Sequence, residues 1–253
     1  MKPEIVREKV GDVPNMSLEQ GKRLADLIEK YQLKSCLELG FFHGVSSAYI
    51  AAALQEIGGG KLTTVDLEYT EGLEPNVQSI LDNLGLREYV DVCLEPTSYT
   101  WRLMHLLEAL PQPQFDFCYI DGSHTWAVDG FAFFLVERLL KPGGWIVFDD
   151  FDRTYRESIE NLAAKRDKLP EKIVDFMLNM PPEEQDTPQV RKVYELLVKS
   201  HPSFDYFRQE DGWAYARKTK HESGVAEVRQ EVVTVRSGGI AGRIKNYLRK
   251  LVG

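Results

Sequence analysis

Carboxylates and one histidine occur in two short stretches that each follow an apolar, strand-like run. The stretch YIDGSH contains Asp121 and His124, and VFDDF contains Asp149 and Asp150. If these strands are neighbours in a parallel sheet, their carboxyl ends bring the three aspartates together. Carboxylates held this close repel one another unless a cation compensates them, and hard oxygen ligands suit Mg²⁺ better than zinc. The pattern predicts a metal site; the alternative is two polar strand ends, with the Asp149-Asp150 pair capping the next segment.

A divalent cation at this place could bind a substrate hydroxyl and lower its pKa. His124 lies three residues after Asp121. An imidazole titrates near neutrality and could accept the proton that the hydroxyl loses. A lone histidine is more often a surface or capping residue, and from the residues alone both interpretations stay open.

The turn in CLELGFFHGVSS is a second candidate site. Gly40 and Gly44 allow close approach of a ligand, and the helix that begins near Ser46 offers free N–H groups to a carboxylate. Glu38 would repel a pyrophosphate but suits an ammonium group, and Asp66 ends the next strand, where it can accept both hydroxyls of a ribose. These features predict S-adenosylmethionine as the ligand. Alternatively, Glu38 is a surface charge and Asp66 an ordinary strand end.

Alternating strand and helix patterns predict the elements that position these residues. Strands with nearly continuous apolar runs, separated by helices, are typical of a doubly wound parallel sheet with helices on both faces. Ser17 is a predicted helix N-cap, and FDYFRQEDGWAYARK (204–218) has the pattern of a hairpin. We therefore expect an α/β fold with a mostly parallel seven-stranded sheet and an antiparallel terminal strand. The five expected parallel strands are 35–40, 61–66, 89–95, 115–121 and 144–150.

Composition excludes several classes of protein. The chain of 253 residues is 43% hydrophobic and 28% charged, and it contains no apolar run of the roughly 18–20 residues that span a bilayer. Its N-terminus lacks the apolar centre of a secretory signal, so we expect a cytoplasmic protein. The three cysteines are expected to be free, buried thiols. The net charge of −8 argues against nucleic-acid binding.

Four motifs together resemble those of a known family. LELGFFHGVSS, TTVDLE, YIDGSH and LLKPGGWIVFDDF are similar to the motifs of class I S-adenosylmethionine-dependent methyltransferases. The resemblance covers about residues 16–218 and lies in the branch that contains catechol and macrolide-sugar O-methyltransferases. It implies a Rossmann-like methyltransferase fold, S-adenosylmethionine as cofactor, and magnesium-assisted methylation of a hydroxyl on a small molecule or sugar moiety.

The resemblance also implies how the cofactor is held. Glu38 would bind its amino group, while Ser46 and the turn backbone (residues 40–44) would hold its carboxylate. Asp66 would bind the ribose, and Ser98 would lie at the adenine. Ser98 stands in EPTSY, which departs from the commoner Gly-Asp/Ser pattern of the family. His43 is expected at most to line the pocket.

For the chemistry, the resemblance places metal ligands at Asp121, Asp149 and Asp150, although many relatives with similar motifs have lost the metal. Catechol-type enzymes place a lysine base three residues after the first of these aspartates, and sugar-modifying relatives place a histidine there. His124 is therefore the expected general base. The histidine, and the lack of an aromatic wall identifiable from the sequence, favour a sugar or polyol acceptor over a catechol.

Three parts are expected along the chain: a helical segment 1–34, a methyltransferase domain 35–218 and a basic tail 219–253. Within the domain, the insertion 152–200 is either a lid that selects the acceptor or a structural appendage. From Arg217 onward the chain has nine Lys/Arg against three Glu. Its last residues, GGIAGRIKNYLRKLVG, form a predicted amphipathic helix that docks on the body or on a second subunit, in a homo-oligomer. Weak contact with a membrane surface and disorder are the alternatives.

Two rival functions remain at this point. A nicotinamide-dependent oxidoreductase on a similar sheet predicts Gly-x-Gly-x-x-Gly after the first strand, and this chain has Gly-x-x-x-Gly instead. A non-catalytic relative would keep the fold and serve as a binding or scaffold module. The presence of all four residues Asp121, His124, Asp149 and Asp150 argues against that second rival.

Overall fold

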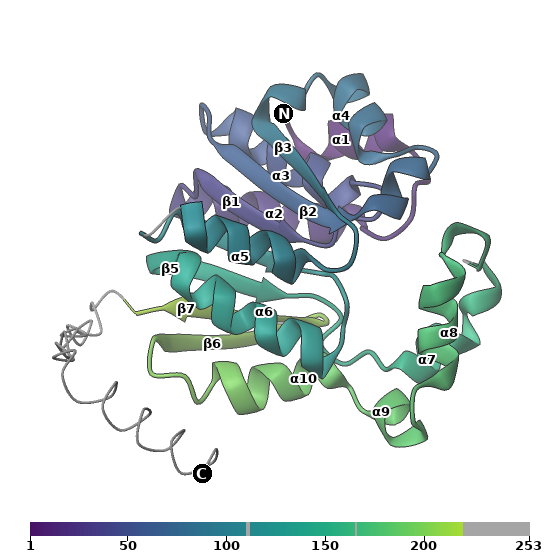
Figure 1. Ribbon diagram of the computed structural model, residues 1–253. Helices are drawn as coiled ribbons and strands as arrows, with labels where there is room; N and C mark the ends of the chain where they lie inside the picture. The colour runs from purple at the N-terminus through teal and green to yellow at the C-terminus, as the bar shows by residue number, and fades with distance from the viewer. Residues whose placement is uncertain (110–111, 165, 220–253) are drawn as a thin grey trace, which may run out of the picture. The chain divides into compact units, whose positions relative to one another are not determined.

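Residues Met1–His221 form one compact unit in this computed structural model (Figure 1). The structure describes residues 1–109, 112–164 and 166–219. The tail with its predicted amphipathic helix lies outside these ranges, apart from residue 219.

The unit is built on one seven-stranded sheet with the order β3-β2-β1-β4-β5-β7-β6. β1 to β5 pair in parallel, and β7 is antiparallel to both β5 and β6. The predicted fold class, including the terminal hairpin with its turn at Asp211-Gly212, is confirmed. The strands are β1 (Ser35–Leu39), β2 (Lys61–Leu67), β3 (Val90–Glu95), β4 (Phe115–Ile120), β5 (Leu140–Phe148), β6 (Phe204–Glu210) and β7 (Trp213–Lys218).

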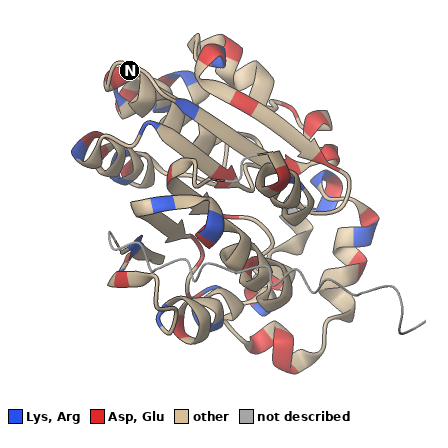
Figure 2. Cartoon of the chain, turned by 60° about the vertical axis from the view of Figure 1, so that its left-hand side comes forward, with Lys and Arg blue, Asp and Glu red and all other residues tan. Residues whose placement is uncertain are grey.

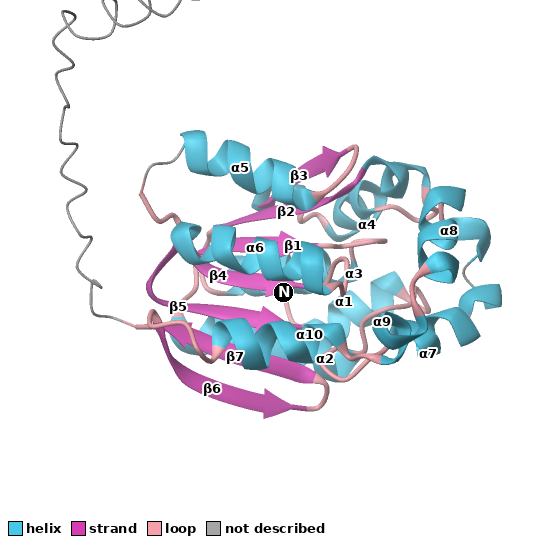
Figure 3. Cartoon of the chain, turned by 60° about the horizontal axis from the view of Figure 1, so that its bottom comes forward, coloured by secondary structure: helices cyan, strands magenta, loops and turns pink. Residues whose placement is uncertain are grey.

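Helices cover both faces of the sheet, as Figure 3 shows for α5, α6 and α10 on one of them. α1 to α4 share an apolar core with the other face. Ser17 caps α2 through a capping box with Gln20, as its position in the sequence predicts. One face is covered by α5 (Tyr99–Ala109), α6 (Trp126–Leu139) and α10 (Gln189–Val193), which a π-helical turn (Tyr194–Val198) extends. The other face is covered by α1 (Pro3–Val10), α2 (Leu18–Tyr31), α3 (Val45–Glu56) and α4 (Val77–Leu84).

The insertion after β5 divides into two halves. Its second half, α10 and the π-helical turn, buries Val190, Val193 and Tyr194 in the core of the sheet. Its first half forms a separate apolar cluster around Leu162 and Val174, beyond the strand ends in Figure 3. This first half contains α7 (Tyr155–Glu160), short 3₁₀ turns at Leu162–Ala164 and Arg166–Lys168, α8 (Glu171–Asn179) and α9 (Pro182–Asp186).

β5 differs from its predicted bounds, 144–150. It begins earlier, at Leu140, because Leu140 pairs with Phe115 before a register shift brings Trp145 opposite Phe117. It ends at Phe148, so the Asp149-Asp150 pair lies just beyond the strand rather than in it. Both aspartates therefore belong to the loop at the carboxyl edge of the sheet.

The surface of the described residues mixes both charge signs. Lys and Arg stand beside Asp and Glu on the same helices (Figure 2), as in the ion pair of Lys22 with Glu19 on α2. Among the described residues, no helix has the length and apolar character needed to cross a membrane. The cysteines are free as predicted: Cys36 and Cys118 are buried and Cys93 is half-buried.

Gly44 offers a test of why the first turn needs glycine. Its φ is +94°, and a Cβ there would lie 2.5 Å from Val77 Cγ2 of α4. Gly58 has a similar φ of +81° with nothing within 4 Å of an added Cβ. We expect Gly58→Ala to lower the free energy of unfolding by about 1–2 kcal/mol, and Gly44→Ala to lower it by about 1–3 kcal/mol more because of the clash. Urea denaturation measures both, and equal losses would show that the Val77 contact is unimportant.

Candidate active site

A cavity of about 810 Å³ lies at the carboxyl ends of the parallel strands. It opens beside β1, whose neighbours β2 and β4 continue the chain in opposite directions along the sheet. Ligands of open parallel sheets bind at such a switch in strand order. The first half of the insertion lines the opposite wall of the cavity.

Glu38 is fully buried at the end of β1 and does not line the cavity. Its Oε2 accepts hydrogen bonds from the hydroxyls of Ser47 and Thr64, the second at 2.6 Å. Its Oε1 is buried and has no hydrogen-bond partner within the described ranges. Burial raises the pKa of the Glu38 carboxyl to about 7. The alternative of a surface charge is therefore wrong, and the role of Glu38 toward the cofactor's amino group stays a prediction.

Asp66 connects the end of β2 to the turn after β1. Its Oδ2 accepts the backbone N–H groups of Phe41 and Phe42, both at 2.7 Å, and its Oδ1 accepts that of Leu67, also at 2.7 Å. Burial raises the pKa of Asp66, and these three donors oppose the rise. The residue lines the cavity, so the same carboxylate shapes the turn and faces the ligand space.

Packing explains why the turn has glycine at two positions, and the sequence did not reveal this packing. Gly40 lines the cavity at φ +88°, and a Cβ there would collide with the Asp121 carbonyl oxygen. Gly44 lies off the cavity and is required by its contact with α4. Ser46, in the first turn of α3, lines the cavity as predicted.

Ser98 and His43 are both expected at the cavity, and only Ser98 lines it. Ser98 lines the cavity together with Thr97 and Tyr99, and its hydroxyl lies 2.9 Å from that of Thr100. His43 does not line the cavity: it is buried, and its Nδ1 lies 2.6 Å from the carbonyl oxygen of Pro75.

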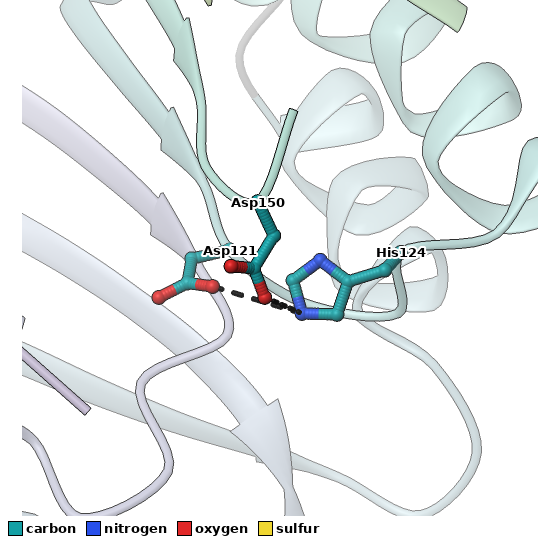
Figure 4. A group of neighbouring side chains, drawn as sticks. All are labelled: Asp121, His124 and Asp150. Atoms are coloured by element: carbon teal, nitrogen blue, oxygen red, sulfur yellow. Dashed lines mark ion pairs between the residues drawn. The ribbon is translucent and has the colours of Figure 1, made fainter. Parts of the chain in front are cut away.

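Asp121, His124 and Asp150 face one another at the other side of the cavity (Figure 4). One oxygen of each carboxylate lies 3.7 Å from His124 Nε2. The three ligand atoms all lie within 4.8 Å of one another. Burial, together with the carboxylates of Asp149 and Asp150, raises the pKa of Asp121 well above its usual range. The arrangement is electrostatically unfavourable without a cation.

Asp149 is not part of this group, although the sequence predicts it as a metal ligand. Its Oδ2 accepts the hydroxyl of Tyr119 at 2.5 Å, and its Oδ1 accepts the backbone N–H of Asp150 at 2.7 Å. The carboxylate is buried, and its hydrogen bond orients the Asp150 backbone. The third member of the cluster is His124, where the sequence predicts Asp149.

The guanidinium of Arg153 lies against this cluster. Arg153 Nη1 donates to Asp150 Oδ2 at 2.5 Å, and the guanidinium opposes the rise in the pKa of Asp121. Sequence analysis did not identify this residue, because its side chain reaches Asp150 only through the tight turn that joins the two.

The geometry agrees with the comparisons with known proteins. A model of the methyltransferase domain matches residues 37–151, which run from β1 to the loop after β5. Residues 37–151, less than half of the chain, are thus similar to methyltransferase domains. Among curated proteins, a catechol O-methyltransferase from Niastella koreensis is 31% identical over 153 residues, or 58% of this chain and 62% of that protein. The match thus spans less than two thirds of the length of that relative.

Solved structures show the fold of this methyltransferase domain. An O-methyltransferase from Bacillus cereus in complex with SAH has a TM-score of 0.60 at 21% identity, covering 86% of this chain and 90% of that one. TomG from Streptomyces achromogenes, an O-methyltransferase involved in tomaymycin synthesis and solved with SAM, has a TM-score of 0.58 at 22% identity, with coverages of 86% and 88%. The fold predicted from the motifs is confirmed, and the match over residues 37–151 agrees with the predicted family.

The methyltransferase domain holds His124 through residues that sequence analysis did not identify. The hydroxyl of Tyr99 donates to the buried Asp129 carboxylate and accepts the backbone N–H of Ser123 at 3.2 Å. The backbone N–H groups of Ser123 and His124 also act on Asp129 as hydrogen-bond donors. His124 has φ +55° and Asp150 has φ +52°, in the left-handed region that non-glycine residues seldom adopt. This network keeps both side chains aimed at the cavity.

The insertion gives the methyltransferase domain an aromatic and apolar cavity wall. Tyr155 and Phe176 both line the cavity, with their ring centroids 6.2 Å apart, and Tyr155 also donates a hydrogen bond to the Ser123 carbonyl oxygen. The sequence-based preference for a sugar acceptor rested partly on the lack of such a wall, and that argument is wrong. Apolar side chains complete the wall: Leu162, Leu169, Ile173 and Met177.

The raised pKa of the buried Glu38 carboxyl predicts that the free energy of unfolding depends on pH. A carboxyl whose pKa is raised on folding from 4.5 to about 7 binds more protons folded than unfolded between these values. Wild-type stability should therefore fall, relative to Glu38→Gln, by on the order of 2 kcal/mol as the pH rises from about 5 to about 8. Chemical denaturation of both proteins across this range measures the difference. A difference that stays constant with pH would contradict the raised pKa.

Proposed function

We propose that this protein is an S-adenosylmethionine-dependent O-methyltransferase in which a divalent cation and His124 act on the acceptor hydroxyl. The observation that carries the proposal is the placement of Asp121, His124 and Asp150 within 4.8 Å of one another in a cavity that Asp66 and Ser46 also line. In this proposal the cofactor site and the cation site share one cavity. The methyltransferase domain match supports the reaction class.

Features of the first turn support S-adenosylmethionine as the cofactor. Ser46 and the start of α3 offer a hydroxyl and free N–H groups to its carboxylate. Asp66 Oδ1 accepts a single backbone N–H, so it retains acceptor capacity for a ribose hydroxyl. The orphaned Oε1 of Glu38 lies behind the wall, where an ammonium group would favour the ionised carboxylate. Ser98 lines the part of the cavity that we assign to the adenine.

The donor set fits a hard divalent cation such as Mg²⁺ or Mn²⁺. Asp121 and Asp150 supply carboxylate oxygens that need compensation, whereas each oxygen of Asp149 already accepts a hydrogen bond, one from the Tyr119 hydroxyl and one from the Asp150 backbone N–H. Bound there, the cation would supply Lewis acidity that lowers the pKa of the acceptor hydroxyl. We assign Asp121 and Asp150 as its ligands and Asp149 as the residue that orients Asp150.

In this proposal His124 is the general base. Its Nε2 is directed into the cluster, and Asp129 and Tyr99 hold its loop. His124 Nε2 would accept the hydroxyl proton as the acceptor oxygen takes the methyl group from the sulfonium of S-adenosylmethionine. The products would be a methyl ether, S-adenosylhomocysteine and protonated His124. The apolar wall of the insertion would exclude water during transfer.

The acceptor is a small molecule with a hydroxyl and an apolar or aromatic body. Tyr155, Phe176 and Met177 line the space opposite the cluster, and such side chains bind apolar surface. The curated relative is a catechol O-methyltransferase, which agrees with this class. A glycan hydroxyl remains the second candidate because a histidine stands at position 124.

A homo-oligomer, weak contact of the tail with a membrane surface, a cytoplasmic location and the absence of nucleic-acid binding stay predictions from the sequence. The exposed Phe131 and Phe134 of α6 would suit a subunit contact.

Replacing His124 distinguishes its role as a general base from a role as a metal ligand. We expect His124→Gln to lower methyl transfer from S-adenosylmethionine to catechol about 100-fold or more, while Mn²⁺ affinity changes less than about twofold, since the carboxylates remain. Label transfer measures the rate and electron paramagnetic resonance measures bound Mn²⁺. His105→Gln is the matched control, because His105 is exposed on α5 and lies 3.3 Å from Glu108, outside the cavity.

Different failures of this experiment have different meanings. Loss of Mn²⁺ affinity in His124→Gln would make His124 a ligand instead of the base. Equal rates with and without a chelator would contradict the cation's role. If wild type transfers label to a methyl glycoside but not to catechol, the glycan alternative replaces the apolar acceptor.

A further inference from the structure

Arg153 lies where the sheet ends and the insertion begins. Its backbone N–H donates to the Asp150 carbonyl oxygen at 3.1 Å, which closes a tight turn. The turn brings the guanidinium back over the acidic cluster, where Nη1 lies 2.5 Å from Asp150 Oδ2. The side chain is 35% exposed and lines the cavity.

The oxygen that Arg153 binds is the one that faces the centre of the cluster. Asp150 Oδ2 is also the atom 3.7 Å from His124 Nε2. A cation held by Asp121 and Asp150 would therefore share this oxygen with the guanidinium. That oxygen would then face two positive charges, whose repulsion solvent screens only partly in this half-buried place.

We propose that Arg153 is an internal counter-cation that competes with the divalent cation for Asp150. The inference rests on the proposed cation site and deepens it. Without the metal, Arg153 compensates the carboxylates and keeps the cluster stable. When the metal binds, the guanidinium must leave Oδ2, so Arg153 weakens metal affinity.

The position of Arg153 links this exchange to the insertion. Thr154, the next residue, caps α7 in a capping box with Glu157. The following Tyr155 reaches back to the Ser123 carbonyl oxygen, one residue before His124. Release of the guanidinium therefore acts on the first turn of the cavity wall.

Other cations of the described chain are placed differently. Arg156 pairs with Asp186 and Arg191 with Asp152, in exposed pairs outside the 810 Å³ cavity. Lys172 lines the cavity, but its Nζ lies 3.4 Å from the Pro96 carbonyl oxygen. Arg153 thus differs from these three residues in binding a proposed ligand oxygen.

The test compares Mn²⁺ affinity in Arg153→Gln with wild type, using electron paramagnetic resonance of the full chain. We expect about tenfold tighter binding, because removing the guanidinium removes one charge repulsion in a partly screened site. Arg156→Gln is the matched control: it removes the same charge from the same segment and should leave the affinity unchanged. Arg153→Lys keeps the charge and should bind within about threefold of wild type. Circular dichroism checks that each variant is folded.

Each outcome decides the matter. Equal or weaker Mn²⁺ binding by folded Arg153→Gln overturns the competition while leaving the cation site in place. Equal tightening in Arg153→Gln and Arg156→Gln also overturns it, since net charge alone would then explain the gain. If neither wild type nor Arg153→Gln binds Mn²⁺, the proposed cation site fails as well.

Discussion

Burial of several carboxylates at one edge of the sheet is the constraint on which the site depends. Glu38, Asp121, Asp129 and Asp149 are each held in surroundings where ionisation is unfavourable, and burial raises the pKa of all four. The fold compensates them unequally. Hydroxyls and backbone N–H groups donate hydrogen bonds to Glu38, Asp129 and Asp149, whereas the negative charge of Asp121 and Asp150 is compensated by the Arg153 guanidinium. The negative charge that remains favours binding of a cation and of a cationic cofactor.

The same constraint explains the unusual local backbone. His124 and Asp150 both adopt left-handed conformations, and each is fixed by a buried aspartate, Asp129 and Asp149 respectively. Such conformations persist only where the surroundings determine them. The buried aspartates therefore hold the two residues that face each other in the cluster. In the proposed site, Asp149, which also lines the cavity, has this supporting role.

Local patterns predicted most of the fold and part of the site. Apolar runs, Ser17 and the turn at Asp211-Gly212 located strands, a helix start and the hairpin because each reflects nearby residues. The motifs placed Asp66 and Ser46 at the cavity, and Asp121, His124 and Asp150 together.

What depends on orientation or on distant packing was not predictable. The early start of β5 follows from its register with β4, and the direction of the Asp149 carboxylate depends on Tyr119. The aromatic wall is formed by Tyr155 and Phe176, in the insertion for which the sequence left a lid and a structural appendage open as alternatives.

The central claim is that cofactor and cation share one cavity, and a paramagnetic measurement tests it directly. S-adenosylmethionine carrying a ¹³C-labelled methyl group would be bound to the protein and titrated with Mn²⁺. The account predicts strong broadening of the methyl resonance that a chelator reverses and that Asp150→Asn abolishes. A methyl resonance that stays sharp while both ligands are bound would place the cation elsewhere and contradict the account.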